Sequence, residues 1–364
     1  MPAPLLAVLN VGMVSGVGLT APECCAAIRC GMNNFQETPF ASAGGAPLVG
    51  STVELEKPCW GIAKLATMAA RVIAECLAGL PDTDQQQVPV LISVAEPDRP
   101  GRFEALAQVL LHDIEHELGI RLHPHSRVIE QGRVGGAVAL LQARRMLTEQ
   151  TCARAIVAGA DSFLTSATLT AYDRDDRLLR RDNSNGFIPG EAAAAALLAI
   201  PGDDVAAPLV LGGIGFAREP APFGSGKPLR ADGLVQAIRG ALEEAGIALK
   251  DCDHRIADVN GEQYRFKEAA LAITRLLRDR KVRFSLWHPG DCTGEIGAAT
   301  LPVMLAMLFA GAAKNYLPGP VFLGHLGNDD EKRAAFVARA TTPQTLALEA
   351  ESEAAFTAAR RGSL

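Results

Sequence analysis

Cysteine and histidine are the residues of this sequence whose side chains could carry nucleophilic or metal chemistry. His112 and His116 have the i, i+4 spacing of a zinc-protease helix, but the catalytic glutamate that should adjoin the first histidine is missing. We therefore interpret them as a surface pair. The cysteines form no CxxC pair and show no spacing typical of a metal site, which favours reduced thiols. The eight are Cys24, Cys25, Cys30, Cys59, Cys76, Cys152, Cys252 and Cys292.

The composition excludes several classes of protein. Apolar residues make up 48% of the 364 residues and charged residues 21%, so the chain is neither disordered nor fibrous. A formal net charge of −6 argues against a nucleic-acid or anionic-membrane partner. The start of the chain shows no signal peptide, and the longest apolar helix candidate, from about Gly297 to Ala312, is shorter than the roughly 20 residues of a membrane span. We expect a compact cytoplasmic protein without a metal or a cofactor.

Short apolar runs alternate with helical patterns, which is typical of an α/β protein. Helices are expected at residues 21–31, 134–147, 234–245, 267–279 and after Gly297. Strands are expected at residues 5–9, 87–94, 155–159, 191–200, 209–216, 255–259 and 282–287, and near Val321 and Phe336. We divide the chain into two α/β halves, residues 1–200 and 201–340, followed by a helical tail over residues 341–364.

Five segments, in order along the chain, carry a resemblance to one family. They are VLNVGMVSGVGLTAPECCAAIRCGMNNF, IVAGADSFLT, NGFIPGEAAAAALLAI, GSGKPLRADGLVQAIRGALEEAGI and GEIGAAT. Together they resemble the β-ketoacyl-acyl-carrier-protein synthases of the thiolase superfamily. The resemblance implies a five-layered αβαβα fold of two pseudo-duplicated halves. It also implies a homodimer, paired along a strand that precedes Ala158, and acyl-carrier thioesters as substrates.

The nucleophile of this family is a cysteine at the start of a helix, where the helix dipole and free N–H groups lower its pKa and form an oxyanion hole. In the family the cysteine lies 24 residues before the alanine of the AGG turn, and counting back from Ala158 gives Val134. A valine cannot be acylated. The surrounding QGRVGGAVAL still predicts the helix, with Val134 at its start.

Two histidines of the family are also replaced. The first matches Asn260 in DVNGEQY; its amide could donate to an enolate or thioester oxygen but could not act as a base. Alternatively, Asn260 only forms an Asn-Gly turn. The second histidine aligns with Gly294, and a one-residue shift offers Glu295 instead. The small Gly294 and Val134 could leave room for an acyl or pantetheine group.

Four further residues are candidates for the same pocket. His288, followed by Pro289, matches the GHP motif of thiolases in a different register, as a catalytic histidine or as a structural one. The segment GHLGND resembles a turn whose phenylalanine gates the family's active site, and here His325 replaces that phenylalanine. His325 and Asn328 either face the pocket or lie in a solvated loop. Cys292 is either a displaced nucleophile or a small buried residue.

These replacements leave two hypotheses for the function. The first is a non-catalytic ketosynthase-like protein of fatty-acid or polyketide type that binds an acyl-carrier protein, an acyl or pantetheine thioester, or a true synthase, as a homodimer or heterodimer. The second is an active acyltransferase or condensing enzyme that uses Cys292. The loss of the cysteine and of both histidines favours the first.

Overall fold

A single ten-stranded sheet runs through the computed structural model, which describes residues 4–202 and 207–341. The strands of the first half are β1 (Leu6–Ser15), β4 (Val90–Val94), β5 (Arg127–Glu130), β6 (Ala155–Ser162) and β7 (Glu191–Ala199). Those of the second half are β8 (Leu209–Arg218), β9 (His254–Ala257), β10 (Leu286–Trp287), β11 (Val321–Gly327) and β12 (Lys332–Ala340). Their order is β10-β9-β11-β12-β8-β1-β7-β6-β4-β5. Because β1 and β8 pair only over Leu6 to Val8, two five-stranded units meet at a short joint.

The two units have the same topology. In the first, β5, β4 and β6 are parallel, and β7 runs antiparallel beside them and next to β1. In the second, β10, β9 and β11 are parallel, and β12 runs antiparallel beside them and next to β8. The chain is therefore built from two pseudo-duplicated α/β halves, as the resemblance implies.

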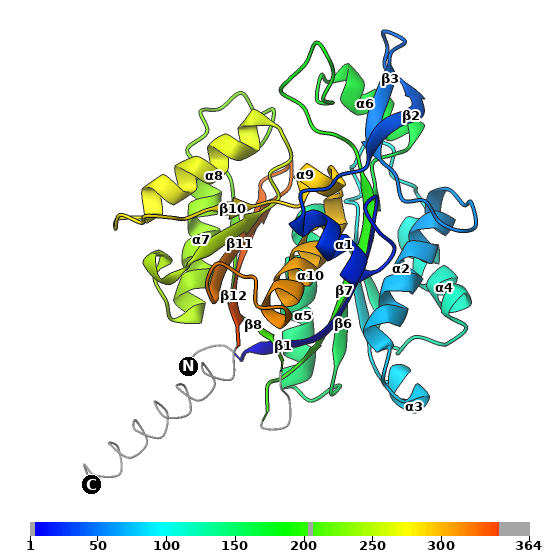
Figure 1. Ribbon diagram of the computed structural model, residues 1–364, viewed down its shortest axis with the longest axis vertical. Coiled ribbons are helices and arrows are strands. Elements are labelled where there is room, and N and C mark those ends of the chain that lie inside the picture. Colours follow the sequence, from blue (N-terminus) through cyan, green and yellow to red (C-terminus); the bar gives the residue numbers. More distant parts are fainter. Residues whose placement is uncertain (1–3, 203–206, 342–364) are drawn as a thin grey trace.

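Helices form three layers, one between the two five-stranded units of the sheet and one on the outer face of each unit (Figure 1). The helices α5 (Gly135–Thr148) and α10 (Thr300–Ala313) lie in the middle layer, where α10 packs against strands of both halves. On the outer faces, α2 (Gly61–Leu77) and α4 (Leu106–Leu118) cover the first half, and α7 (Asp232–Ala245) and α8 (Gln263–Leu276) cover the second. The result is the expected αβαβα arrangement.

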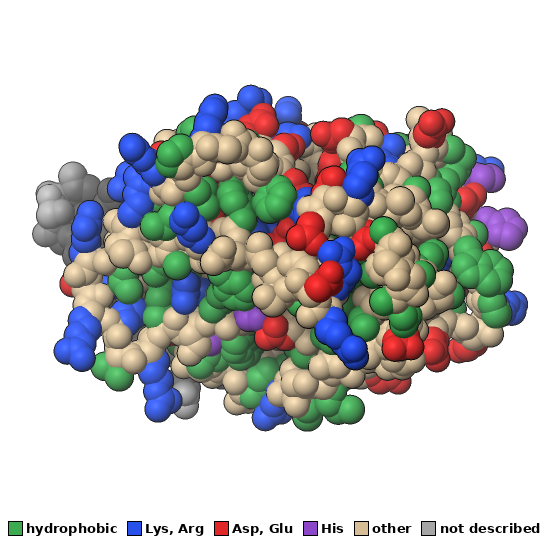
Figure 2. Space-filling view, turned by 90° about the horizontal axis from the view of Figure 1, so that it is seen from above, with side chains coloured by type: hydrophobic (Ala, Val, Ile, Leu, Met, Phe, Trp, Pro, Cys, Tyr) green, Lys and Arg blue, Asp and Glu red, His purple; other side chains and the backbone are tan. Residues whose placement is uncertain are grey.

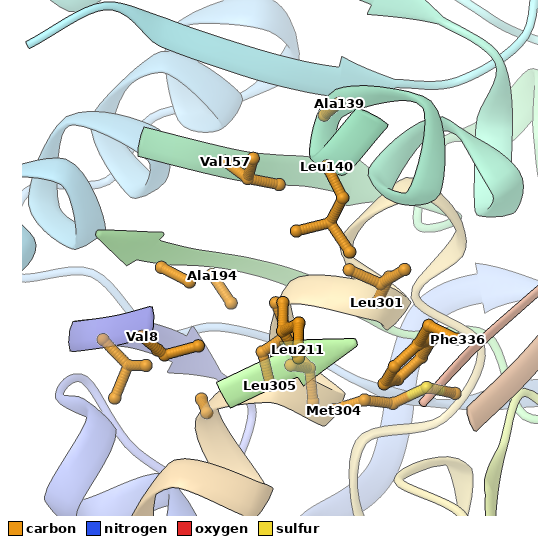
Figure 3. Close-up of a cluster of buried hydrophobic side chains, with 14 of the residues drawn as sticks. Val8, Ala139, Leu140, Val157, Ala194, Leu211, Leu301, Met304, Leu305 and Phe336 are labelled. Atoms are coloured by element: carbon orange, nitrogen blue, oxygen red, sulfur yellow. The ribbon is translucent and has the colours of Figure 1, made fainter. Parts of the chain in front are cut away.

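The middle layer is tightly packed, and α10 is apolar along its length because sheet strands and α5 enclose it. A Cβ atom on Gly136 would lie 2.8 Å from the Cβ of Leu301, so glycine lets α5 approach α10. Figure 3 shows side chains of both helices among those of the strands. Those labelled include Leu140, Leu301, Met304 and Leu305 from the helices and Val157, Ala194, Leu211 and Phe336 from the strands.

Most elements lie where the sequence predicts them, with shifted ends. The expected strand over residues 282–287 shrinks to the two residues of β10. Residues 324–327, expected to form a turn, belong to β11, so that expectation is wrong. The elements that were not predicted include α2, α6 (Ser166–Arg174), and a separate hairpin of β2 (Phe35–Ala41) and β3 (Pro47–Ser51). The expected helical tail lies outside the described residues.

The described residues contain no helix that is both long enough and apolar enough to cross a membrane. Figure 2 looks down on the end of the molecule that carries the β2–β3 hairpin. Acidic and basic side chains are intermixed over the middle of this face, with hydrophobic side chains between them. The middle of this face therefore presents no field of a single sign.

Candidate functional site

Val134 lies at the start of the middle-layer helix α5. A short 3-10 helix, Gly132–Val134, runs directly into α5, and Val134 is its N-cap residue. The backbone turns sharply here, and Gly132 has a φ of +56°. A Cβ atom at this position would lie 2.2 Å from an oxygen of Glu96, so a larger residue would not fit. A helix N-terminus of this kind can activate a nucleophile or hold an anion. Val134 is 2% exposed and supplies no nucleophile.

Asn328, a residue of the second half, hydrogen-bonds to the backbone at the start of α5. It follows β11 in the chain and is 2% exposed. Its Oδ1 accepts the N–H of Val134 at 3.2 Å, and its Nδ2 donates to the carbonyl of Gln131 at 3.0 Å. The structure therefore brings Asn328 and Val134 together. One N–H of the helix start is already bonded within the protein.

Arg133, the residue before Val134, takes part in a buried ion pair. Arg133 binds Glu295 through two parallel hydrogen bonds of 3.0 and 2.7 Å, and both side chains are 2% exposed. Glu295 also accepts the amide of Asn260 and, at 2.9 Å, the backbone N–H of Gly297. Burial acts to raise the pKa of Glu295, but the charge of Arg133 more than offsets it and lowers the pKa to about 2. Glu295 is therefore a permanent anion and a very weak base.

Gly294 and Glu295 are the two candidates for the position of the second family histidine. Of these, Glu295 has a side chain that contacts another candidate, Asn260. Gly294 has a φ of +69°, and a Cβ on it would lie 2.7 Å from the carbonyl oxygen of Ile188. Only glycine fits there without strain. Asn260, whose amide donates to both Glu295 and Glu262, has its donors directed at protein carboxylates.

A second group of charges surrounds this pair, and the sequence interpretation did not include it. Asp329 accepts hydrogen bonds from Arg133 at 3.2 Å, from Arg177 at 2.6 Å and from Arg265. Arg177 also binds Glu262 through hydrogen bonds of 2.7 and 2.9 Å. Burial opposes ionisation of Asp329, yet the nearby arginines hold its pKa well below the usual range. The one feature of the sequence that pointed to this group of charges was Arg133, an arginine next to the nucleophile position in an apolar segment.

Little space remains around these residues. The cavity bordered by Asn260, Gly294 and Glu295 measures about 10 Å³, and the one bordered by Asn328 and Asp329 about 90 Å³. Sites for ligands the size of a drug molecule measure roughly 300–1,000 Å³. The room expected from the small residues at 134 and 294 is therefore not present in these two cavities. Charged side chains occupy the volume instead.

Cys292 and His288 border a different cavity. Cys292 is the third residue of the four-residue helix α9 (Gly290–Thr293), and burial raises the pKa of its thiol. An activated nucleophile needs the opposite shift. His288 lies 3.3 Å from Asp291, Nδ1 to Oδ1. Both line a cavity of about 370 Å³ with Trp287, whose lining includes neither Val134 nor Asn260.

His325 is a buried strand residue, and the expectation of a solvated loop histidine is wrong. In β11 it pairs with Ala257 and Ala335 and is 2% exposed. Strand alternation places it on the same face as Leu323, which packs with α7 and α8, and not on the middle-layer face. Burial and, secondarily, the charge of Arg255 lower its pKa to about 3. The structure does not bring His325 to Val134.

The chain is similar in sequence to subunits of bacterial polyketide synthases, whereas no family model matches it. It is 32% identical over 212 residues to the actinorhodin polyketide putative beta-ketoacyl synthase 2 of Streptomyces coelicolor, covering 52% of this chain and 49% of that protein. It is 31% identical over 233 residues to the tetracenomycin polyketide synthase ketoacyl synthase beta subunit of Streptomyces glaucescens, covering 58% and 55%. The chain thus spans about half the length of these relatives.

Solved ketosynthase structures share the fold. A type II polyketide ketosynthase in complex with its acyl-carrier protein, AntDE:AntF, matches with a TM-score of 0.78 at 14% identity, over 94% of this chain and 100% of that chain. The ketosynthase ApeO in complex with its chain length factor ApeC, from Xenorhabdus doucetiae, matches with a TM-score of 0.70 at 13% identity, over 93% and 98%. The chain therefore has the thiolase-like ketosynthase fold.

Proposed function

We propose that this protein is a non-catalytic ketosynthase-like subunit that pairs with an active ketosynthase in the synthesis of acyl chains on a carrier protein. The observation that carries the proposal is the helix start at Val134, which has no nucleophile and whose N–H is bonded to Asn328. Arg133, the residue before Val134, takes part in a buried ion pair with Glu295. One relative is described as a beta subunit, and one structural neighbour is a ketosynthase bound to its chain length factor.

The edge strand β5 supports pairing with a second ketosynthase-like chain. It is the last strand of the sheet, precedes Ala158 in the chain, and pairs with β4 alone among the described strands. The free edge of such a strand can continue the sheet into a partner. A homodimer would contain no cysteine at position 134 in either subunit, so the proposal favours a heterodimer with a true synthase. The cytoplasmic location and the boundary near residue 201 stay predictions.

Light scattering of the protein alone and mixed with candidate ketosynthases of its organism tests the pairing. We expect a 1:1 complex with one of them, and we expect Val128→Lys, on the edge strand β5, to abolish it. The matched control is Thr274→Lys on the exposed face of α8, which should leave the complex intact. A protein that stays at 38.3 kDa with every ketosynthase offered contradicts the proposal.

Intact-mass spectrometry after incubation with acyl-carrier and malonyl-carrier thioesters tests the lack of catalysis. We expect no covalent acyl adduct and no condensation product, because a two-step transfer needs an acylated nucleophile. An adduct that disappears in Cys292→Ser would support the alternative of a displaced nucleophile. The raised pKa of the buried Cys292 thiol speaks against it.

A further inference from the structure

One cavity of this chain has no part in the proposed function. It measures about 510 Å³ and lies between the β2–β3 hairpin, the start of α2 and the segment after β6. Its walls are mainly apolar and include three aromatic side chains, Phe40, Trp60 and Phe103. Its volume falls within the roughly 300–1,000 Å³ typical of small-molecule sites.

This cavity lies on the other face of the sheet from Val134. Its lining residue Leu65 belongs to the hydrophobic cluster that α2 and α4 form on the outer face of the first half. Val134 belongs to the middle-layer cluster, together with α5 and α10. The strands β6 and β7 separate the two clusters, so the cavity is not a branch of the filled ketosynthase site.

The polar floor of the cavity is an ion pair between Lys64 and Glu191. Their side chains are 15% and 3% exposed. Glu191 also accepts the N–H of Val53 and the hydroxyl of Ser162, each at 2.9 Å, so protein donors occupy both carboxylate oxygens. The ammonium group of Lys64 has three N–H donors and gives one to Glu191. The floor is therefore neutral overall and can still donate hydrogen bonds.

Trp60 stands at the rim of the cavity. It is the N-cap residue of α2, makes no side-chain cap hydrogen bond, and is 79% exposed. Most of the apolar surface of this indole is therefore exposed to water. A flat ring stacked against the indole would bury that surface. Aromatic walls, a neutral floor and spare donors together define the chemistry of an occupant.

We propose that this cavity binds a flat, uncharged aromatic molecule with a carbonyl or hydroxyl oxygen that accepts a hydrogen bond from Lys64. The rings of Trp60 and Phe103 contact the aromatic part of the ligand, and the ammonium group meets its oxygen. A charged ligand is disfavoured because Lys64 and Glu191 already neutralise each other. The inference is independent of the pairing with a ketosynthase.

Fluorine NMR of protein labelled with 5-fluorotryptophan tests the proposal, because the chain contains two tryptophans. Trp60 lines this cavity and Trp287 lines the cavity of Cys292, so each reports on one of them. Trp60→Phe and Trp287→Phe assign the two resonances. We expect coumarin, which is flat, uncharged and carries a carbonyl, to shift the Trp60 resonance saturably and to leave Trp287 unchanged.

Two comparisons separate the proposed site from weak surface adsorption. Phe103→Ala should weaken coumarin binding about tenfold, the loss of one aromatic contact. The matched control Phe266→Ala, which removes an exposed ring on α8, should not change it. Naphthalene should bind less tightly than coumarin because it offers Lys64 no oxygen. The proposal is overturned if the Trp60 resonance does not shift saturably, if Phe103→Ala binds like the wild type, or if naphthalene binds as well as coumarin.

Discussion

The backbone N–H of Val134 donates to the side-chain oxygen of Asn328 at 3.2 Å, although 194 residues separate them in the chain. A helix start that stabilises an oxyanion must keep its N–H groups free for the developing charge. Here one of them is directed at an amide oxygen from the opposite half. At this helix start that N–H is therefore not free for an oxyanion, and Val134 supplies no thiol.

Restoring the thiol alone should not restore condensation. In Val134→Cys the new thiol would gain no general base, because Arg133 lowers the pKa of Glu295 to about 2 and leaves it a very weak base. Asn260 also cannot accept a proton as an imidazole does. We expect no condensation product from malonyl-carrier and acyl-carrier thioesters, measured by mass spectrometry. Turnover by this variant would show that the Asn260 and Glu295 positions still serve catalysis.

Arg133 should be essential for stability, because it compensates buried carboxylates. Arg133→Met leaves Glu295 and Asp329 without this partner, and we expect a loss of about 3 kcal/mol in the free energy of unfolding. The double variant Arg133→Met/Glu295→Met should recover part of this loss. Urea unfolding measures both. Arg145→Met, which breaks an exposed pair with Glu149, is the control and should leave the unfolding midpoint unchanged.

Stability should fall as the pH drops from about 6.5 towards 4. Burial lowers the pKa of His254 to about 4 and that of His325 to about 3, from 6.5 when unfolded. Below pH 6.5 the unfolded chain therefore binds protons that the folded chain does not, and stability is lost at up to about 1.4 kcal/mol per pH unit for each group. Denaturant unfolding across this range measures the slope. His325→Phe should reduce it, and an unchanged slope in that variant would contradict the assignment.

Gly159 should not tolerate a side chain. A Cβ atom there would lie 2.3 Å from the carbonyl oxygen of Ala298 and 2.8 Å from the hydroxyl of Ser93. Because β6 is held between β4 and β7, we expect Gly159→Ala to cost about 2 kcal/mol and to lower the melting temperature. Gly202→Ala, where no heavy atom lies within 4 Å of the added Cβ, should melt like the wild type.

The sequence predicted the elements whose apolar periodicity matches their burial, such as β6 and α5. It missed α2, although its buried residues Leu65, Val72 and Ile73 follow a helical spacing; its N-cap residue Trp60 gives no start signal. The glycines of GHLG suggested a turn, but Gly324 instead makes room for Phe336, whose ring a Cβ would meet at 2.1 Å. In this case glycine marks a close side-chain approach within a strand.

For the site, the resemblance located Val134 and Asn328, and the structure joins them. The charges around them could not be predicted in the same way. Arg133 and Glu295 are separated by 162 residues and Arg177 and Glu262 by 85, so each pair exists only after the two halves have come together. Local periodicity carries no information about such partners.

The ion pairs across the two halves also bear on how the chain folds as it leaves the ribosome. Arg133 and Arg177 are synthesised well before Glu262, Glu295 and Asp329, the carboxylates that pair with them. Until those residues emerge, burial of these arginines on the inner face of the first half would lack most of their counterions, which is unfavourable. We therefore expect the nascent first half to keep that face open to water, and its middle layer to close when the second half arrives.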